Sequence, residues 1–413
     1  MLLRFRIANV RSFRDEQELS FVVQPGHSPQ LSRRVAIGGG RDLELYPVIG
    51  IFGANASGKS NVLMAFVLMR NAVLNSYAQW ASYRDVPREP FNLDPKPTQD
   101  SSFFEIDFLQ DGVRYTYGFE LGATRVEAEW LHAYPRGRRQ VWFDRNATRD
   151  PVFEFPGERL RDRAQLVRMT RPNALFLTLA GTNNHPDLSP LFYWFQRNLW
   201  LVTPENDRFQ REHYTREALL GPRRARIEEL LRVADLGITG VEVESTDADR
   251  TEVRLLHQGA GGEAFPIDWE LESFGTRSWF ALVGPILLAL DEGAVLLIDE
   301  LDASLHPRFA AEVIRLFQDP DVNTTGAQLV FTSHDVTVLG TPSGERLLDP
   351  GQVWLTEKDA TGATELYPLS AAEPGEREDL TKSYLAGRFG AVPAISEGQI
   401  GRQLRIARAT EPD

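Results

Sequence analysis

The feature that most constrains the fold is the segment GANASGKS at residues 53–60, which directly follows the apolar run VIGIF. It fits the pattern G-x-x-x-x-G-K-[ST], and the residues after it have the apolar spacing of a helix. A buried strand, a glycine-rich turn and a helix in this order predict a loop whose backbone N–H groups point at phosphate oxygens. In such a loop Lys59 reaches the β- and γ-phosphates of a nucleotide, and the Ser60 hydroxyl binds Mg²⁺. The candidate nucleotide-binding residues are Gly53, Ala54, Asn55, Ala56, Ser57, Gly58, Lys59, Ser60 and Asn61.

A second apolar run, AVLLI at residues 294–298, ends in two acids, Asp299 and Glu300. Two carboxylates at the end of a buried strand are costly unless a cation or hydrogen bonds compensate them. Asp299 is therefore a candidate Mg²⁺ ligand, and Glu300 is a candidate general base that activates a water molecule. A third run, QLVFT at residues 328–332, completes a set of buried strands that alternate with helices. This alternation predicts a parallel α/β core.

The predicted elements divide the chain into four parts. Residues 1–149 hold the phosphate-binding segment and alternating strands with an Asp-Gly hairpin signal, which predict an antiparallel β subdomain. Residues 150–240 are rich in arginine and aromatic side chains and have a mainly helical pattern. Residues 241–374 carry the second half of the core, and residues 375–413 form a tail. We therefore predict an α/β fold with an antiparallel β subdomain and an inserted, mainly helical subdomain.

The composition is that of an ordinary globular protein, and it limits the kinds of molecule that the chain is expected to bind. Of the 413 residues, 42% are hydrophobic and 25% are charged, and the absence of cysteine excludes disulfides, thiolate metal sites and a cysteine nucleophile. The net charge of −13 argues against a protein that coats nucleic acid, so any DNA contact has to use a local patch. The N-terminal residues lack a signal-peptide pattern, and the longest apolar run is shorter than the roughly 20 residues of a membrane span. We expect a cytoplasmic protein with no membrane partner.

Three further segments resemble motifs of the ATP-binding-cassette (ABC) ATPases and occur in the same order along the chain. The segment ESFGTR at residues 272–277 is similar to their S-x-G signature, LDASLHP at residues 301–307 to their D-loop, and FTSH at residues 331–334 to their switch-histidine segment. The resemblance implies a P-loop NTPase fold of the ABC-ATPase head type, with ATP and Mg²⁺ as cofactors. The site residues that it adds are Ser273, Gly275, Asp302 and His334.

The resemblance also implies a mechanism in which two chains sandwich two ATP molecules. Ser273 and Gly275 of one chain would meet the γ-phosphate held by Lys59 of the other, so ATP would join a homodimer, with higher assembly left open. Glu300 would activate water, His334 would sense the γ-phosphate, and hydrolysis would let the dimer open.

Five other residues keep open assignments. Arg11 and Ser12 either touch the nucleotide, as in the resembled heads, or serve the structure alone. Arg277 either adds positive charge near the γ-phosphate or forms a salt bridge on the helix surface. Gln110 and Gln140 are candidates for the Mg²⁺-sensing glutamine of the class, against the alternative that both are ordinary surface residues.

Two more segments resemble one branch of the class. IANVRSF at residues 7–13 is similar to the opening of RecF, Rad50 and SMC proteins, and YLAGRFGAVP at residues 384–393 is similar to a segment of the stand-alone AAA15 family. That family is similar to the ATPase half of OLD nucleases and is linked to phage defence and abortive infection. The resemblance implies a switch that controls an effector protein encoded by a neighbouring gene, with a nuclease as one candidate. Unlike Rad50 and SMC proteins, this chain has no heptads between residues 60 and 272.

The leading alternative is a DNA-repair ATPase that binds gaps or ends. Ten arginines from Arg136 to Arg171 stand against five acids, and aromatic residues are interleaved with them. Such a segment either contacts a phosphate backbone or forms a solvated face that pairs with its own acids. The inserted segment argues against a transporter subunit, and the presence of Glu300 argues against a scaffold that binds ATP without hydrolysing it.

Overall fold

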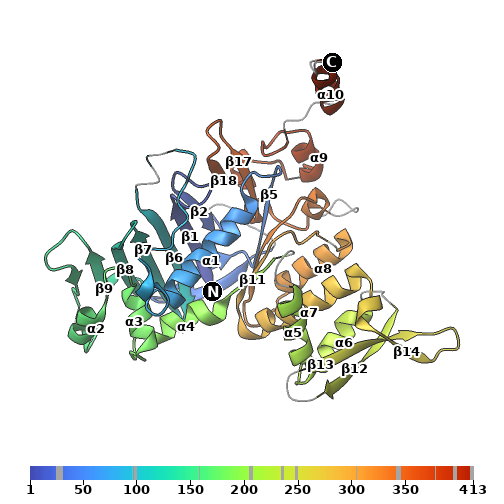
Figure 1. Ribbon diagram of the computed structural model, residues 1–413, viewed down its shortest axis with the longest axis horizontal. Coiled ribbons are helices and arrows are strands. Elements are labelled where there is room, and N and C mark those ends of the chain that lie inside the picture. The colour runs from blue at the N-terminus through green and yellow to red at the C-terminus, as the bar shows by residue number, and fades with distance from the viewer. Residues whose placement is uncertain are drawn as a thin grey trace.

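A six-stranded sheet forms the centre of the computed structural model (Figure 1), as expected for a parallel α/β core. Its first five strands run parallel and its last runs antiparallel. In spatial order they are β11 (Leu199–Val202), β15 (Val295–Ile298), β16 (Gln328–Thr332), β5 (Val48–Gly53), β17 (Val353–Lys358) and β18 (Thr364–Pro368). The structure describes residues 1–24, 31–94, 96, 100–157, 159–203, 208–233, 237–246, 250–303, 305–340, 346–376, 378–393 and 398–409.

Both faces of the central sheet are buried, which explains why its strands read as continuous apolar runs. In β5, Ile49 and Ile51 enter one hydrophobic core, whereas Val48 and Phe52 enter a second core on the opposite face. Successive side chains of a strand point to opposite faces, so an unbroken run of apolar residues is needed to fill both cores. Because these strands are parallel neighbours, the carboxyl ends of β5, β15 and β16 meet at one edge of this sheet.

A seven-stranded antiparallel sheet confirms the predicted β subdomain. Its first and last neighbours are β10 (Phe153–Glu154) and β2 (Gln17–Ser20). The strands between them are β9 (Gln140–Asn146), β8 (Val126–Tyr134), β7 (Val113–Leu121), β6 (Ser102–Gln110) and β1 (Leu2–Ala8). Asp111 and Gly112 join β6 to β7 with φ values of 50° and 73°, so the predicted hairpin is confirmed. A separate hairpin contains β3 (Arg33–Ile37) and β4 (Arg41–Leu45).

The helices of residues 150–240 pack in two different places. α2 (Arg163–Met169), α3 (Phe176–Thr182) and α4 (Ser189–Asn198) lie with α1 (Lys59–Asn75) on the core that faces the antiparallel sheet. α5 (Arg208–Leu219) and α6 (Arg224–Val233) instead pack on the second core with α7 (Phe274–Glu292). Between these two groups, β11 joins the central sheet beside β15. The mainly helical segment thus contacts both cores of the molecule.

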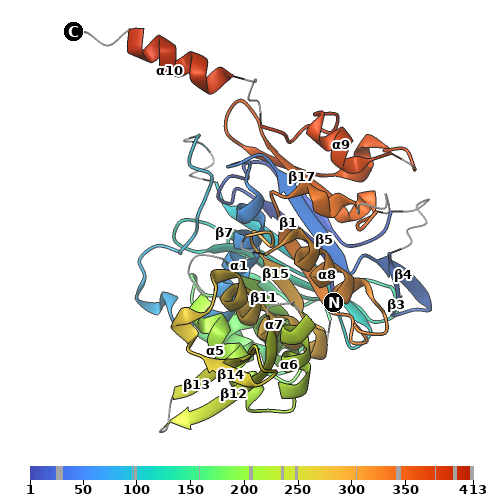
Figure 2. The ribbon, with the colours of Figure 1, turned by 90° about the vertical axis from the view of Figure 1, so that its right-hand side faces the viewer.

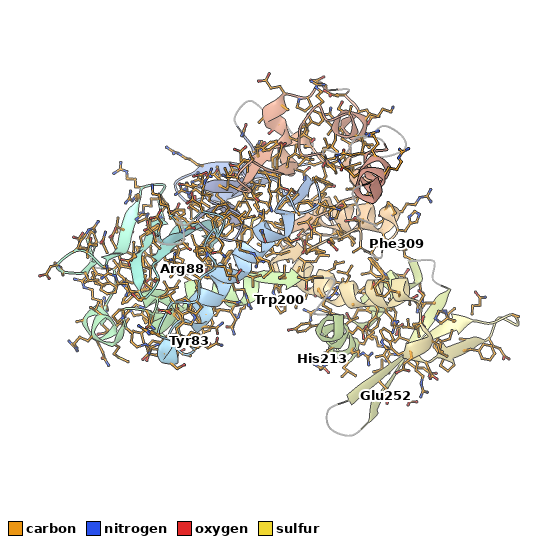
Figure 3. The ribbon with its side chains drawn as sticks, turned by 45° about the horizontal axis from the view of Figure 1, so that its top comes forward. Tyr83, Arg88, Trp200, His213, Glu252 and Phe309 are labelled. Atoms are coloured by element: carbon orange, nitrogen blue, oxygen red, sulfur yellow. The ribbon has the colours of Figure 1, made fainter. Side chains whose placement is uncertain are left out.

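A second lobe projects from the α7 side of the molecule (Figures 1 and 3). It contains α5 to α7 and a small antiparallel sheet of β12 (Ile238–Thr246), β13 (Arg250–Gln258) and β14 (Ala264–Ile267). Figure 3 labels Trp200 on β11, His213 on α5 and Glu252 on β13, and so traces the chain from the central sheet into this lobe. α8 (Pro307–Gln318) packs on the second core of the central sheet, which also contacts α5, α6 and α7.

The C-terminal part begins against the central sheet and ends away from it. α9 (Leu380–Leu385) lies beside the short helix η3 (Val336–Leu339), and α10 (Gln399–Ala409) projects from the body (Figure 2). The other 3₁₀ helices are η1 (Trp80–Ser82), η2 (Trp269–Leu271), η4 (Pro350–Gln352) and η5 (Leu369–Ala372). In the part of the chain that the structure describes, no helix is both long and apolar enough to cross a bilayer.

Candidate functional site

The loop of residues 53–60, called the phosphate loop below, connects β5 to α1 as the sequence predicts. Gly53 and Gly58 have φ values of 155° and 112°, in the region that favours glycine. A Cβ atom at Gly53 would lie 2.5 Å from the carbonyl oxygen of Thr356, and one at Gly58 would lie 2.4 Å from Thr364 Oγ1. Both glycines are therefore required by close packing as well as by backbone conformation.

Lys59 lies inside this loop and is almost fully buried. Its Nζ donates to the carbonyl oxygens of Gly53 and Ala54 at 2.9 and 3.0 Å, and lies 3.3 Å from His334 Nδ1. Burial lowers the pKa of the ammonium group, while the carboxylates of residues 299, 300 and 302 act in the opposite direction. The ammonium group is held by neutral partners at the mouth of the loop, where phosphate oxygens would be stronger partners for it.

Ser60 of α1 and Asp299 at the end of β15 lie side by side. Ser60 Oγ donates to Asp299 Oδ1 at 2.9 Å, and Thr332 Oγ1 donates to the same carboxylate oxygen at 2.6 Å. A hydroxyl and a carboxylate side by side are oxygen ligands of the kind that Mg²⁺ prefers. Among the described residues, no group of three His, Cys, Asp or Glu side chains could hold a metal ion. Phosphate and water oxygens would therefore have to complete the coordination, which is the usual arrangement for Mg²⁺ at nucleotides.

Glu300 follows Asp299 at the end of β15, and His334 follows the end of β16. The backbone of Glu300 has a φ of 52°, and its N–H group donates to Thr332 Oγ1 at 2.8 Å. His334 Nε2 lies 3.8 Å from Glu300 Oε1, and the backbone N–H group of His334 donates to the Asp302 carboxylate at 3.2 Å. The imidazole therefore lies between the lysine of the phosphate loop and the candidate general base. Ser304 of the D-loop lies outside the described residues.

Two threonines that the sequence analysis missed support the phosphate loop from β17 and β18. Thr356 Oγ1 lies 2.6 Å from Ser57 Oγ, and Thr364 Oγ1 donates to the Ser57 carbonyl oxygen at 2.8 Å. Both strands follow His334 in the chain, about 300 residues beyond the loop that they contact. No sequence motif indicates these two threonines. Their contact with the phosphate loop could have been predicted only by first predicting that β17 lies beside β5.

Arg11 and Ser12 lie beside Asn61, in the first turn of α1. Arg11 Nε donates to Asn61 Oδ1 at 2.8 Å, and its guanidinium group forms an ion pair with Glu89 at 3.0 Å. Ser12 Oγ accepts from Asn61 Nδ2 at 2.7 Å and lies 2.8 Å from Thr364 Oγ1. Both residues thus form part of the wall of the phosphate loop, a position compatible with either of the two roles expected for them.

The signature segment at residues 272–277 begins α7 in the second lobe. Ser273 is the N-cap of this helix, and its Oγ accepts from the Thr276 N–H group at 3.0 Å. The buried Glu272 accepts from His257 Nε2 of β13 at 2.8 Å, which fixes the preceding backbone. Leu271 and Phe274 on either side are 76% and 57% exposed. In the described structure no hydrogen bond or ion pair joins Ser273 to the phosphate loop of its own chain.

Sequence comparison places this site in a known family. Residues 48–340, more than half of the chain, match the model of a family described as "AAA domain, putative AbiEii toxin, Type IV TA system". The chain belongs to this AAA family. Its fold is the mixed α/β fold expected for a P-loop domain, with the phosphate loop between β5 and α1 of a mainly parallel sheet. No curated protein matches its sequence.

Three solved structures similar to this AAA-family protein are heads of SMC proteins. The head domain from Thermotoga maritima has a TM-score of 0.41 and 16% identity, over 89% of this chain and 98% of that chain. A head bound to the C-winged helix domain of ScpA has a TM-score of 0.44 and 12% identity, over 90% and 99%. A head with an extended coiled coil, bound to the C-terminal domain of ScpA derived from Pyrococcus furiosus, has a TM-score of 0.41 and 12% identity, over 90% and 97%.

Three candidate side chains lie apart from the phosphate loop or contribute no bond to it. Gln110 ends β6 and donates from Nε2 to the carbonyl oxygen of Pro190 at 3.3 Å, whereas Gln140 is exposed at the start of β9. Arg277 is half-buried on α7, and its Nε atom has no hydrogen-bond partner among the described residues. The Mg²⁺-sensing role of either glutamine stays a prediction.

The arginines of residues 136–171 divide into structural and exposed groups. Arg145 is buried, faces Glu129 and donates to the carbonyl oxygen of Ala174 at 2.7 Å, and Arg171 donates to the carbonyl oxygen of Tyr77. Other members pair with acids or lie over aromatic rings. The exposed side chains without an ion pair or hydrogen bond to a described residue are those of Arg136, Arg138, Arg161 and Arg168.

Proposed function

We propose that this AAA-family protein is a cytoplasmic switch that binds and hydrolyses ATP and acts as a dimer. The observation that supports this proposal is the convergence of Lys59, Asp299 and His334 at the carboxyl ends of three parallel strands. These side chains come from segments up to 275 residues apart. A structural role alone would not require a buried ammonium group, a metal-type oxygen pair and an imidazole at one strand edge.

Each group at this edge of the central sheet has a defined role in the proposed reaction. The backbone N–H groups of the phosphate loop and Lys59 bind the phosphates of ATP, while Ser60 and Asp299 hold Mg²⁺. Bound Mg²⁺ supplies positive charge that compensates the phosphate oxygens. Glu300 accepts a proton from the attacking water, and His334 lies where it can hydrogen-bond either Lys59, Glu300 or a phosphate oxygen.

The second lobe is the basis for proposing a dimer. Ser273 presents a helix N-terminus between two exposed apolar side chains, Leu271 and Phe274. N–H groups at a helix N-terminus bind anions, so the γ-phosphate held by a second copy is a suitable partner. In this arrangement Asp302 and His334 would lie near the partner's signature segment, and hydrolysis would remove the anion that joins the two chains.

The name of the family suggests the biological setting. A family described by a putative abortive-infection toxin supports a role in a bacterial anti-phage or abortive-infection system. We propose that the chain is the ATPase component of such a system, of the AAA15 type, and controls an effector protein. A nuclease is one candidate for that effector.

The experiment that tests the proposal is steady-state ATP turnover with the Lys59→Ala variant as the contamination control. Turnover by the wild type, its loss in the variant and the formation of an ATP-dependent dimer would support a hydrolysing switch. A protein that binds ATP without any Lys59-dependent turnover would contradict hydrolysis, and one that stays monomeric with ATP and Mg²⁺ would contradict the dimer.

A specific observation favours DNA contact as a second candidate function. The turn of the β3–β4 hairpin touches the turn of the β8–β9 hairpin, because a Cβ atom at Gly38 would lie 2.5 Å from the Pro135 carbonyl oxygen. Three exposed arginines lie at these turns, and the side chains of Arg41, Arg136 and Arg138 form no ion pair or hydrogen bond within the described structure. Exposed arginines without acidic partners suit a phosphate backbone.

Binding of a fluorescent DNA duplex tests whether the exposed arginines at the two turns contact DNA or have no binding role. The triple variant Arg41→Ala, Arg136→Ala and Arg138→Ala should weaken binding and reduce its salt dependence. The control Arg161→Ala with Arg168→Ala removes equally exposed arginines on and near α2. Equal losses in both variants, or no binding by the wild type, would contradict a duplex-binding surface at the two turns.

A further inference from the structure

Thr332 contacts three consecutive residues at the acidic end of β15. Its Oγ1 donates to Asp299 Oδ1 at 2.6 Å and accepts from the Glu300 N–H group at 2.8 Å. Its carbonyl oxygen accepts from the Leu301 N–H group at 3.0 Å. The side chain is fully buried at the carboxyl end of β16, which pairs with β15 in parallel register. Asp299, Glu300 and the residue after them are thus all held by one neighbour.

The two hydroxyl bonds have different consequences for the two acids. Asp299 Oδ1 is shared between Thr332 and Ser60, so the carboxylate is oriented by a donor on each side. Glu300 occupies the left-handed region at a φ of 52°, which costs energy for a residue with a side chain. Its N–H bond to Thr332 Oγ1 helps hold that conformation and thereby directs the glutamate away from the strand.

A hydroxyl makes both bonds through a single oxygen atom, because Asp299 needs a donor and the Glu300 N–H group needs an acceptor. Valine has nearly the same shape as threonine but supplies neither, so it would leave the Glu300 N–H group without this partner. Serine retains the hydroxyl and loses only a methyl group. Comparing the valine and serine variants therefore separates the effect of the hydroxyl group from the effect of side-chain volume.

We propose that Thr332 is a positioning residue that sets the Asp299 carboxylate for Mg²⁺ and the Glu300 backbone for water activation. The inference rests on the proposed ATPase function. In that function Thr332 would act through Asp299 and Glu300 and would not itself contact the nucleotide or the attacking water. Partners that orient metal ligands typically affect metal affinity or activity by about 10- to 100-fold when removed. Thr332 should therefore affect the Mg²⁺ requirement more than the affinity for the nucleotide itself.

The test titrates Mg²⁺ against wild type, Thr332→Val and Thr332→Ser, with binding of a fluorescent ATP analogue and ATP turnover as separate readouts. In Thr332→Val we expect the Mg²⁺ concentration for half-maximal binding to rise by about 10-fold and turnover to fall by about 10-fold or more. Binding without Mg²⁺ should change little, and Thr332→Ser should restore most of both effects.

Thr178→Val is the matched control, since Thr178 is also fully buried and its hydroxyl bonds to the Val73 carbonyl oxygen at 2.6 Å, away from the acids. Wild-type Mg²⁺ dependence in Thr332→Val would overturn the inference. So would an equal change in Thr178→Val, or a failure of serine to rescue a variant that melts at the wild-type temperature. If the wild type binds Mg²⁺-ATP without turning it over, hydrolysis is contradicted while the binding titration still decides the role of Thr332.

Discussion

The sheet edge that carries the phosphate loop differs from the signature segment in how many of its polar side chains find hydrogen-bond partners elsewhere in the same chain. At the edge, Lys59 bonds to two carbonyl oxygens, and Asp299 accepts from hydroxyls on two other elements. At the signature segment, the Ser273 side chain bonds, among the described residues, only within its own first helical turn, and Leu271, two residues before it, is exposed. The polar groups of the first region are thus paired within the chain, whereas the second region is held on one side and exposed on the other.

This difference indicates which part of the proposed reaction needs a second molecule. Nucleotide binding uses groups that are already oriented by the central sheet, so one chain should suffice for it. Hydrolysis and dimer formation would use the signature segment, whose anchors, His257 and the preceding Glu272, fix its backbone but do not cover it. Four substitutions test the comparison.

Lys59→Ala should produce the largest effect, because it removes the ammonium group of the phosphate loop. We expect ATP binding to weaken by at least about 100-fold, in line with the loss of a charged phosphate contact in a buried site. The fold should be retained, since within the described structure the Lys59 side chain bonds only to loop carbonyl oxygens and to His334. Calorimetric titration with ATP checks the binding, and circular dichroism checks the fold. Near-normal affinity would show that the edge is not the nucleotide site.

Glu300→Gln should separate binding from hydrolysis. Glutamine keeps the shape but accepts a proton far less readily, so turnover should fall by about 100-fold or more. Binding should remain, because no hydrogen bond of the Glu300 side chain supports the phosphate loop in the described structure. The ATP-bound dimer should persist longer, which light scattering after size-exclusion chromatography would measure. Turnover at the wild-type rate would mean that another group activates the water.

Leu271→Asp should affect only the region that the chain leaves open. A charge at this exposed position next to Ser273 should weaken the ATP-dependent dimer by about 10-fold, because apolar anchors buried in an interface each contribute about 1 kcal/mol or more. ATP binding by a single chain should be unchanged. The control Val322→Asp alters another exposed apolar residue, which is 44% exposed in the loop after α8. Equal dimerisation of both variants and wild type would remove the signature face from the interface.

The same comparison explains how much the sequence alone could predict. The phosphate loop and Asp299-Glu300 follow short continuous motifs whose chemistry needs fixed residue types, and the three buried strands follow from unbroken apolar runs. The threonines at positions 332, 356 and 364 escaped notice because a lone hydroxyl residue at a strand end has many uses. Their roles depend on which strands become neighbours.

Sequence reasoning was least informative where short elements join distant parts. β11 has only four residues, yet it forms the edge of the central sheet, and its Val202 carbonyl oxygen accepts from the Asp299 N–H group at 2.9 Å. A four-residue apolar run inside a helical segment does not distinguish a strand from a helix end. The division of residues 150–240 between two cores follows from that one strand, because the chain crosses the molecule through it.

Thr215→Val should have the smallest effect and should be confined to the second lobe. The buried Thr215 of α5 donates from Oγ1 to the Phe280 carbonyl oxygen at 2.8 Å and accepts from the Gly284 N–H group at 3.1 Å. These two groups lie one turn apart in α7, directly before Pro285, which has no N–H group to continue the helix bonds. The hydroxyl thus bridges the turn that precedes Pro285 in the helix that joins Ser273 to β15.

Valine at position 215 should therefore reduce stability by about 1–3 kcal/mol, because both bridged groups lose a buried partner. Hydrogen exchange should become faster in α7 but not in α1, and ATP affinity should stay at the wild-type value because the phosphate loop lies in the other region. Serine at the same position is the control that keeps the hydroxyl. Faster exchange in both helices would show that the two regions unfold as one unit, and that the open signature segment is not independent of the closed edge.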